Sequence, residues 1–156
     1  MYNSIIEFIE KDTTKIEKFI KESLLSGNMM CFEEELFDTV LEFGRSLYQE
    51  ILESIEQTIR NSEVCKQSYY VERKEDHRTL LTRFGNIEIT RAYYSSKQDR
   101  KGIYLLDKYV GLDSNEKVSL AAKVHALREA VETSYRKGGE EACLTEDVVT
   151  KQTVKK

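Results

Sequence analysis

Hydrophobic residues in the first part of the chain recur at the spacing of a helix face. Between residues 3 and 25 they lie mostly three, four or seven positions apart, which predicts an amphipathic helix. Gly27-Asn28 then predicts its end and a turn. The same spacing returns from Leu36 to Ile59 and predicts one long helix from Phe32 to about Arg60. The first 62 residues are therefore expected to form a helical hairpin.

The apolar face of the second predicted helix is wide, because Phe37, Leu41 and Tyr48 broaden the main stripe. One short partner helix cannot cover so wide a face. Two interpretations remain open. The face packs within the protein, as most apolar helix stripes do, or residues 32–60 join copies of the chain into a homo-oligomer.

At about residue 63 the pattern changes to short runs rich in Tyr, Thr, Ile and Arg. The runs Leu80–Phe84 and Ile87–Tyr94 flank Gly85-Asn86, a pair typical of a β-hairpin turn. We expect a third strand within residues 102–112 and a further one over Tyr69–Arg73. These elements predict a small antiparallel sheet.

From Asp113 the helical spacing returns, with an apolar stripe from Leu120 to Val131. Residues 134–143, a turn, and residues 150–156 match a helix-turn-helix in outline, in which the second helix reads the major groove of DNA. The sequence thus predicts an α+β fold in three segments: an acidic helical hairpin (1–62), a small basic antiparallel sheet (63–112) and helices with a truncated helix-turn-helix-like end (113–156).

Charge is distributed unevenly over these segments. Residues 1–62 hold 6 Lys and Arg against 13 Asp and Glu, a net charge of −7, whereas residues 63–111 hold 10 against 7, a net charge of +3. An acidic first segment and a basic middle segment indicate two different tasks. In the middle segment arginines are interleaved with tyrosines. Arginine can bind phosphate, and tyrosine can stack on bases. The alternative is that the tyrosines fill one sheet face and the arginines are solvated. The interleaved residues are Arg73, Arg78, Arg83, Arg91, Tyr69, Tyr70, Tyr93 and Tyr94.

Motifs for catalysis and metal binding are missing from the sequence. It contains no phosphate-binding glycine loop, nucleophile elbow or zinc-protease motif, and both histidines, His77 and His125, stand alone. Cys31, Cys65 and Cys143 are too scattered for a zinc site and fit a reducing cytoplasm. No apolar run is long enough to span a membrane. We therefore expect a cytoplasmic protein that is not an enzyme and has no cofactor, metal or small-molecule substrate.

Several stretches together resemble a known bacterial family. The stretches "LLTRFGNIEITRAYYSS", "YLLDKYVGL", "EAVETSYRKGGEEA" and "VTKQTV" are similar, in this order, to the N-terminal region of ISLre-type insertion-sequence transposases, which are also grouped as an uncharacterised protein family. The opening "MYNSIIEFIE" and the long acidic helix resemble the start of that family, so the likeness covers essentially the whole chain.

The resemblance implies a DNA-transposition origin and a helix-turn-helix-like segment after the Thr82-Arg83-Phe84-Gly85 hairpin. In such transposases the acidic, metal-binding catalytic domain follows this region, whereas this chain stops at Lys156. We therefore expect a truncated transposase-like protein with residual DNA binding; the alternative is a non-enzymatic self-association module built on the helical hairpin. The residues expected to bind DNA are Ser134, Tyr135, Arg136, Lys137, Lys151, Gln152, Thr153 and Lys155.

Overall fold

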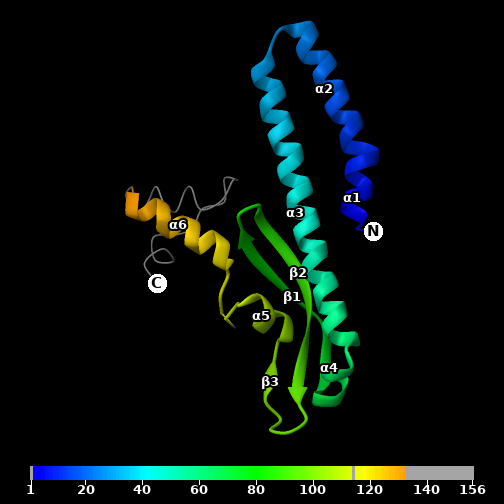
Figure 1. Ribbon diagram of the computed structural model, residues 1–156, viewed down its shortest axis with the longest axis vertical. Helices are drawn as coiled ribbons and strands as arrows, with labels where there is room; N and C mark the ends of the chain where they lie inside the picture. Colours follow the sequence, from blue (N-terminus) through cyan, green and yellow to red (C-terminus); the bar gives the residue numbers. More distant parts are fainter. Residues whose placement is uncertain (1, 114, 133–156) are drawn as a thin grey trace. The chain divides into compact units, whose positions relative to one another are not determined.

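The chain folds into long helices, then a small antiparallel sheet, then shorter helices, which confirms the predicted α+β class (Figure 1). The computed structural model describes residues 2–113 and 115–132. Contacts divide the chain into two compact units, Met1–Glu50 and Ile51–Lys156. The boundary falls inside one long helix, α3 (Met29–Asn61). The predicted division at residues 62 and 112 stays a prediction.

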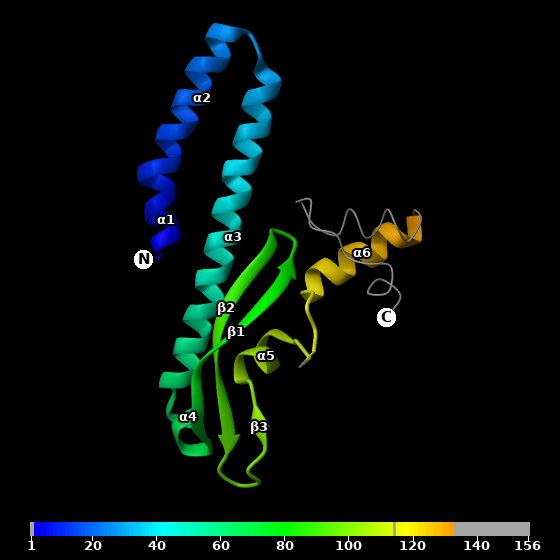
Figure 2. The same cartoon turned by 180° about the vertical axis from the view of Figure 1, so that it is seen from behind.

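The first unit is an antiparallel pair of helices. Its elements before α3 are α1 (Asn3–Glu7), the π-helical turn η1 (Phe8–Asp12) and α2 (Thr13–Ser26). Gly27 ends α2 at a φ of 68°, a left-handed conformation that glycine adopts because it has no Cβ. Figures 1 and 2 both show α2 running beside the first part of α3. The predicted first helix and its end at Gly27-Asn28 are confirmed.

A single carboxylate connects the start of α1 to α3 within this unit. The Glu50 carboxylate accepts hydrogen bonds from the backbone amides of Asn3 (3.1 Å) and Ser4 (3.0 Å) and from the Ser4 hydroxyl (2.6 Å). The first amides of a helix have no partner within the helix, so a negatively charged acceptor is favourable there. Nearby, the rings of Phe8 and Phe43 lie 4.4 Å apart between centroids.

The second unit contains a three-stranded antiparallel sheet in the order β1-β2-β3. After α4 (Glu63–Ser68) come β1 (Tyr69–Thr82), β2 (Gly85–Ser96) and β3 (Gly102–Ile103). Because Tyr69 pairs with Ser96 and Thr82 with Gly85, the two predicted runs 69–73 and 80–84 belong mostly to the one strand β1, which ends at Thr82.

The predicted turn of the hairpin is wrong by two positions. Thr82 pairs with Gly85, so the turn consists of Arg83 and Phe84, and Gly85 begins β2. The reason is the buried Thr82 hydroxyl, which donates to the Gly85 carbonyl (2.8 Å) and accepts from the Phe84 amide (3.1 Å). A threonine side chain that closes a turn in this way competes with the glycine signal in the sequence.

The predicted third strand over residues 102–112 is wrong beyond Ile103. Only Gly102 and Ile103 are extended, and α5 (Leu105–Val110) follows. A strand alternates its side chains between two faces. The first turn of α5 instead buries three consecutive side chains, those of Leu105, Leu106 and Asp107.

The helix α6 (Leu120–Glu132) confirms the helix predicted in this region, but the residues of its predicted apolar stripe are exposed, Leu120 by 61% and Val131 by 88%. Its first residues pack on the end of β1 in a cluster of Leu81, Val118, Ala122 and Ala126. The Ser119 hydroxyl caps the helix by accepting from the Ala122 amide at 3.2 Å.

Candidate nucleic-acid interface

The residues that the sequence predicts to bind DNA lie outside the described part of the chain. They are Ser134, Tyr135, Arg136, Lys137, Lys151, Gln152, Thr153 and Lys155, and they stay a prediction. The second predicted interface, formed by the arginines and tyrosines of the β1–β2 hairpin, lies within the described part.

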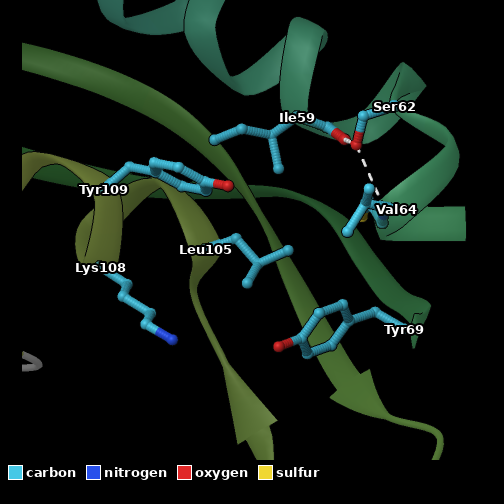
Figure 3. A pocket seen from close by; sticks show the side chains of 8 residues that line it. Ile59, Ser62, Val64, Tyr69, Leu105, Lys108 and Tyr109 are labelled. Carbon is cyan, nitrogen blue, oxygen red and sulfur yellow. Dashed lines mark hydrogen bonds between the residues drawn. The ribbon is translucent and has the colours of Figure 1, made fainter. Parts of the chain in front are cut away.

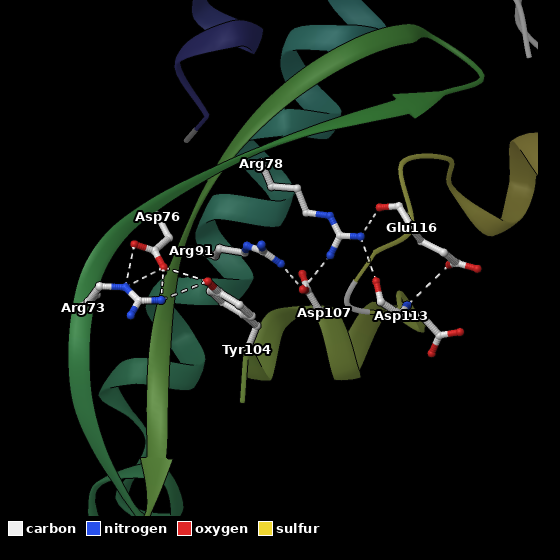
Figure 4. A network of polar contacts seen from close by, with 8 residues as sticks. All are labelled: Arg73, Asp76, Arg78, Arg91, Tyr104, Asp107, Asp113 and Glu116. Atoms are coloured by element: carbon white, nitrogen blue, oxygen red, sulfur yellow. Dashed lines mark hydrogen bonds and ion pairs between the residues drawn. The ribbon is translucent and has the colours of Figure 1, made fainter. Parts of the chain in front are cut away.

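Two of the hairpin arginines are buried, and both form ion pairs inside the protein. Arg78 on β1 and Arg91 on β2 both form ion pairs with the Asp107 carboxylate of α5, the first at 2.6 Å (Figure 4). Arg78 also donates to the backbone carbonyls of Asp113 (2.8 Å) and Glu116. Both interpretations of these two arginines, as phosphate contacts or as solvated side chains, are therefore wrong.

The buried cluster has two guanidinium groups and one carboxylate. The Arg91 guanidinium also lies over the Tyr104 ring, 3.7 Å from its centroid, which adds a cation–π contact. Burial lowers the pKa of both Arg78 and Arg91, because it disfavours their charged forms. These arginines hold α5 on the sheet, and their donors point away from solvent.

Arg73 is more accessible but has partners of its own. It forms an ion pair with Asp76 (2.8 Å) and donates to the Tyr104 hydroxyl (3.2 Å), as Figure 4 shows. The hydrogen bond from Arg73 holds the pKa of Asp76 below its ordinary value. The Arg73 guanidinium also lies 4.3 Å from the centroid of the Tyr93 ring. This group is a surface network rather than a free cation.

The tyrosines of the hairpin also include a buried and an exposed side chain. Tyr94 is fully buried, and its hydroxyl donates to Glu56 of α3 at 2.6 Å. Burial raises the pKa of Tyr94, and the Glu56 carboxylate adds to this effect. Tyr70 is 51% exposed. The prediction that the tyrosines fill one sheet face is confirmed for Tyr94 and wrong for Tyr70.

Tyr70 lies beside the connection between β2 and β3, which we call the basic turn and define as residues 97–101. The Lys97 amino group is 4.8 Å from the centroid of the Tyr70 ring, and the Arg100 guanidinium is 5.7 Å from it. The turn contains three cations, Lys97, Arg100 and Lys101, against one carboxylate, Asp99. It therefore combines an exposed aromatic ring with a net positive charge.

Hydrogen bonds fix the backbone of the basic turn. The Ser96 amide donates to the Lys101 carbonyl (2.9 Å), and the Arg100 amide donates to the Ser96 carbonyl (3.0 Å). The Lys97 amide donates to the Ser68 carbonyl (2.9 Å), which connects the turn to the end of α4. Arg100 has a φ of 59°, a strained conformation for a residue other than glycine. The backbone of the turn is thus fixed, while its lysines make exposed contacts of their own: the Lys97 amino group donates to the Lys66 carbonyl (2.6 Å), and Lys101 pairs with Asp99 (3.4 Å).

The basic turn lies outside the interfaces predicted from the sequence, because those use cations of strands and helices. The signal was present as "KQDRK", a cationic run directly after the tyrosine-rich strand. In the described ranges, no three His, Cys, Asp or Glu side chains gather as they would around a metal ion. None of the helices described for this chain is long and apolar enough to cross a membrane.

A family model described as "Uncharacterised protein family (UPF0236)" matches residues 25–156. With more than half of its residues matched, the chain belongs to the UPF0236 family.

Similar proteins come from Caldanaerobacter subterraneus subsp. tengcongensis. One UPF0236 protein of this organism is 30% identical over 149 residues, which cover 96% of this chain and 31% of the relative. Another is 28% identical over 165 residues, which cover 92% of this chain and 33% of the relative. The chain therefore spans about a third of the length of these relatives. No solved structure matches it.

Proposed function

We propose that this chain is a DNA-binding, non-catalytic portion of a transposase-like protein and that it acts in the cytoplasm. The observation that supports DNA binding most directly is the basic turn. Lys97 and Arg100 flank the exposed ring of Tyr70 on a backbone fixed by hydrogen bonds. Cations that contact phosphate supply most of the affinity of sequence-independent DNA binding, and an aromatic ring adds stacking.

The names of the relatives support a mobile-element origin. The name of one relative combines eleven labels of one series from a single strain, and the name of another combines four. One protein that recurs under many labels in one genome is the pattern that a self-copying genetic element leaves. This pattern agrees with the resemblance of the sequence to insertion-sequence transposases.

The test of DNA binding is fluorescence anisotropy with a short labelled DNA duplex, measured over a range of salt concentrations. We expect binding that weakens steeply with salt, because each phosphate contact releases a counterion. Replacing Lys97 or Lys101 by Ala should weaken binding and reduce the slope of log K against log salt by about 1 each. Lys117→Ala removes an exposed lysine elsewhere in the same unit. It should change the DNA affinity and the salt slope less than either of these substitutions does. Absence of binding at low salt would rule out the proposal.

A second candidate function, self-association through residues 32–60, is supported by exposed apolar side chains of the helical pair. Phe37 is 49% exposed and Val40 is 48% exposed on α3. Further exposed apolar side chains belong to Ile20, Leu24, Leu25, Met29 and Met30. Monomeric proteins seldom expose so many neighbouring apolar groups unless a partner covers them. Light scattering across protein concentration tests this candidate, and a strict monomer contradicts it.

We propose no catalytic step for this chain. The corresponding test is incubation of supercoiled plasmid with the protein and Mg²⁺ or Mn²⁺. We expect the plasmid to remain intact, and metal-dependent nicking would contradict this part of the proposal.

A further inference from the structure

The second unit contains a pocket that the predicted DNA-binding residues do not include. It lies between the end of α3, α4, the start of β1 and α5, and its volume is about 390 Å³ (Figure 3). This volume is at the lower end of the range of roughly 300–1,000 Å³ that is typical of small-ligand sites. The pocket is large enough for one ring system with its substituents.

The inner wall of the pocket is apolar and uncharged. Ile59 and Leu105 are 9% and 5% exposed, and Cys65 beside them is 5% exposed. Burial raises the pKa of the Cys65 thiol, so this group is protonated and neutral near pH 7. A flat apolar group fits against such a wall without leaving a charge buried.

The rim of the pocket offers aromatic rings and positive charge. Tyr69, Lys108 and Tyr109 line it, and none of the described lining residues is acidic. Figure 3 shows both phenol hydroxyl groups pointing into the space between the labelled side chains. Within the described residues, no hydrogen bond occupies either hydroxyl or the Lys108 amino group. The rim therefore suits a ligand that has an aromatic face and a negative charge.

The pocket and the basic turn meet at the start of β1. Tyr69 lines the pocket, whereas its neighbour Tyr70 contacts Lys97 and Arg100 of the turn. Consecutive residues of a strand point to opposite faces, and β1 is an edge strand of the sheet. A nucleic-acid strand that passes around this edge can therefore contact the turn with its phosphates and the pocket with one base.

We propose that this pocket receives a single unstacked base of single-stranded DNA, with the ring against Tyr69 and Tyr109 and the adjoining phosphate near Lys108. The proposal rests on the proposed DNA-binding function and assigns it a substrate class, DNA with an unpaired base. A base has the flat apolar face that the inner wall fits, and its phosphate supplies the negative charge that the rim favours.

The experiment uses the full chain and a fluorescein-labelled single strand that contains one 2-aminopurine. Anisotropy of fluorescein reports total binding, and 2-aminopurine fluorescence reports whether the base leaves its neighbours and stacks on a tyrosine. A fully paired duplex is measured in parallel. We expect both signals to change with the single strand, and we expect the single strand to bind more tightly than the duplex.

Variants of the rim complete the test. Tyr109→Ala should abolish the 2-aminopurine response and weaken single-strand binding roughly five- to a hundredfold, with little effect on the duplex. Tyr109 is 71% exposed, so this change should preserve the fold, which circular dichroism checks. Tyr109→Phe keeps the ring and should retain the response. Lys108→Ala should weaken single-strand binding more than the matched control Lys117→Ala does.

The outcomes separate this inference from the proposed function. Anisotropy that rises equally for duplex and single strand, with no 2-aminopurine response, overturns the proposal that the pocket receives a base. The proposed DNA binding then remains. A 2-aminopurine response that Tyr109→Ala leaves unchanged also overturns the proposal that the base enters this pocket, because the base then stacks elsewhere. Absence of any anisotropy change with either DNA overturns both proposals.

Discussion

At the residue scale, the second unit buries two guanidinium groups around one carboxylate. Arg78 and Arg91 are 8% and 7% exposed, and Asp107 is 4% exposed. A buried charge without a counter-charge costs several kcal/mol, so Asp107 is the residue on which the burial of both arginines depends. The excess positive charge is reduced by backbone carbonyls at Arg78 and by the Tyr104 ring at Arg91.

Asp107→Asn is therefore expected to be strongly destabilising. The amide keeps the shape of the carboxylate but removes the negative charge that is in direct contact with both guanidinium groups, which should lower the free energy of unfolding by about 3–5 kcal/mol. Urea unfolding followed by circular dichroism measures the loss. Asp113→Asn is the matched control, because the Asp113 side chain is exposed, and it should change the free energy by less than about 0.5 kcal/mol. Equal losses for both variants would contradict the assignment.

The hydrogen bonds of Glu50 predict a pH dependence of stability. The Ser4 hydrogen bonds lower the pKa of Glu50 from its ordinary value of 4.5, so the folded state favours the ionised carboxylate. The stabilisation is complete above pH 4.5 and is lost as the pH falls through the lowered pKa of the folded protein.

Glu50→Gln should remove this dependence. The variant is expected to be less stable than the parent chain near neutral pH, and the difference should shrink as the pH falls below 4.5, where the parent carboxylate becomes protonated. Thermal unfolding at a series of pH values measures the two curves. A difference that stays constant with pH would show that packing, and not ionisation, is what the substitution changes.

The sequence alone does not predict which arginines are buried. Arg78 and Arg91 alternate with polar and apolar residues just as solvated strand residues do. Their partner Asp107 lies 29 and 16 residues further along the chain, in a segment whose apolar residues suggested a strand. A long-range ion pair leaves no local pattern, so only the fold identifies it.

At the element scale, the helices were predictable and the shorter connections were not. The period of the stripe from Leu36 to Ile59 extends over many turns, which is why α3 was predicted to within a few residues. The turn at Arg83-Phe84 and the six-residue α5 each depend on one side chain, Thr82 and Asp107 respectively. Short elements of this kind follow tertiary contacts more than local propensity.

The basic turn offers a substitution that separates stability from binding. Arg100 has a φ of 59°, which glycine adopts at little steric cost. Arg100→Gly should therefore keep the stability of the turn or raise it by about 1 kcal/mol, while it removes one of the three cations. Duplex affinity should fall and its salt slope should decrease by about 1.

Two measurements on the same sample check this prediction, urea unfolding and duplex anisotropy. Arg100→Ala serves as the comparison, because it removes the same cation and keeps the strained backbone. Both variants should bind DNA equally weakly. The alanine variant keeps the backbone strain of the parent chain and should match its stability, whereas the glycine variant should match or exceed it. Unchanged affinity in both would exclude Arg100 as a phosphate contact.

At the scale of the whole molecule, the two units differ in charge. Residues 1–50 contain 5 Lys and Arg against 11 Asp and Glu, a net charge of −6, whereas the cationic turn belongs to the second unit. An acidic surface repels DNA, so we assign DNA contact to the second unit and self-association to the first. The two proposed activities then respond to salt in opposite directions. Salt weakens cation–phosphate contacts, and it screens the repulsion between two acidic units that associate through apolar side chains.

Self-association should therefore strengthen as salt is raised, and Val40→Glu should abolish it. Val40 is 48% exposed on α3, and a carboxylate there opposes burial of the apolar face against a second copy. Sedimentation velocity over protein and salt concentration measures the effect. Val131→Glu makes the same change at a position that is 88% exposed on α6 and should leave association intact. Association that weakens with salt, or that both variants disrupt equally, would show that the apolar face of the helical pair is not the surface that joins the copies.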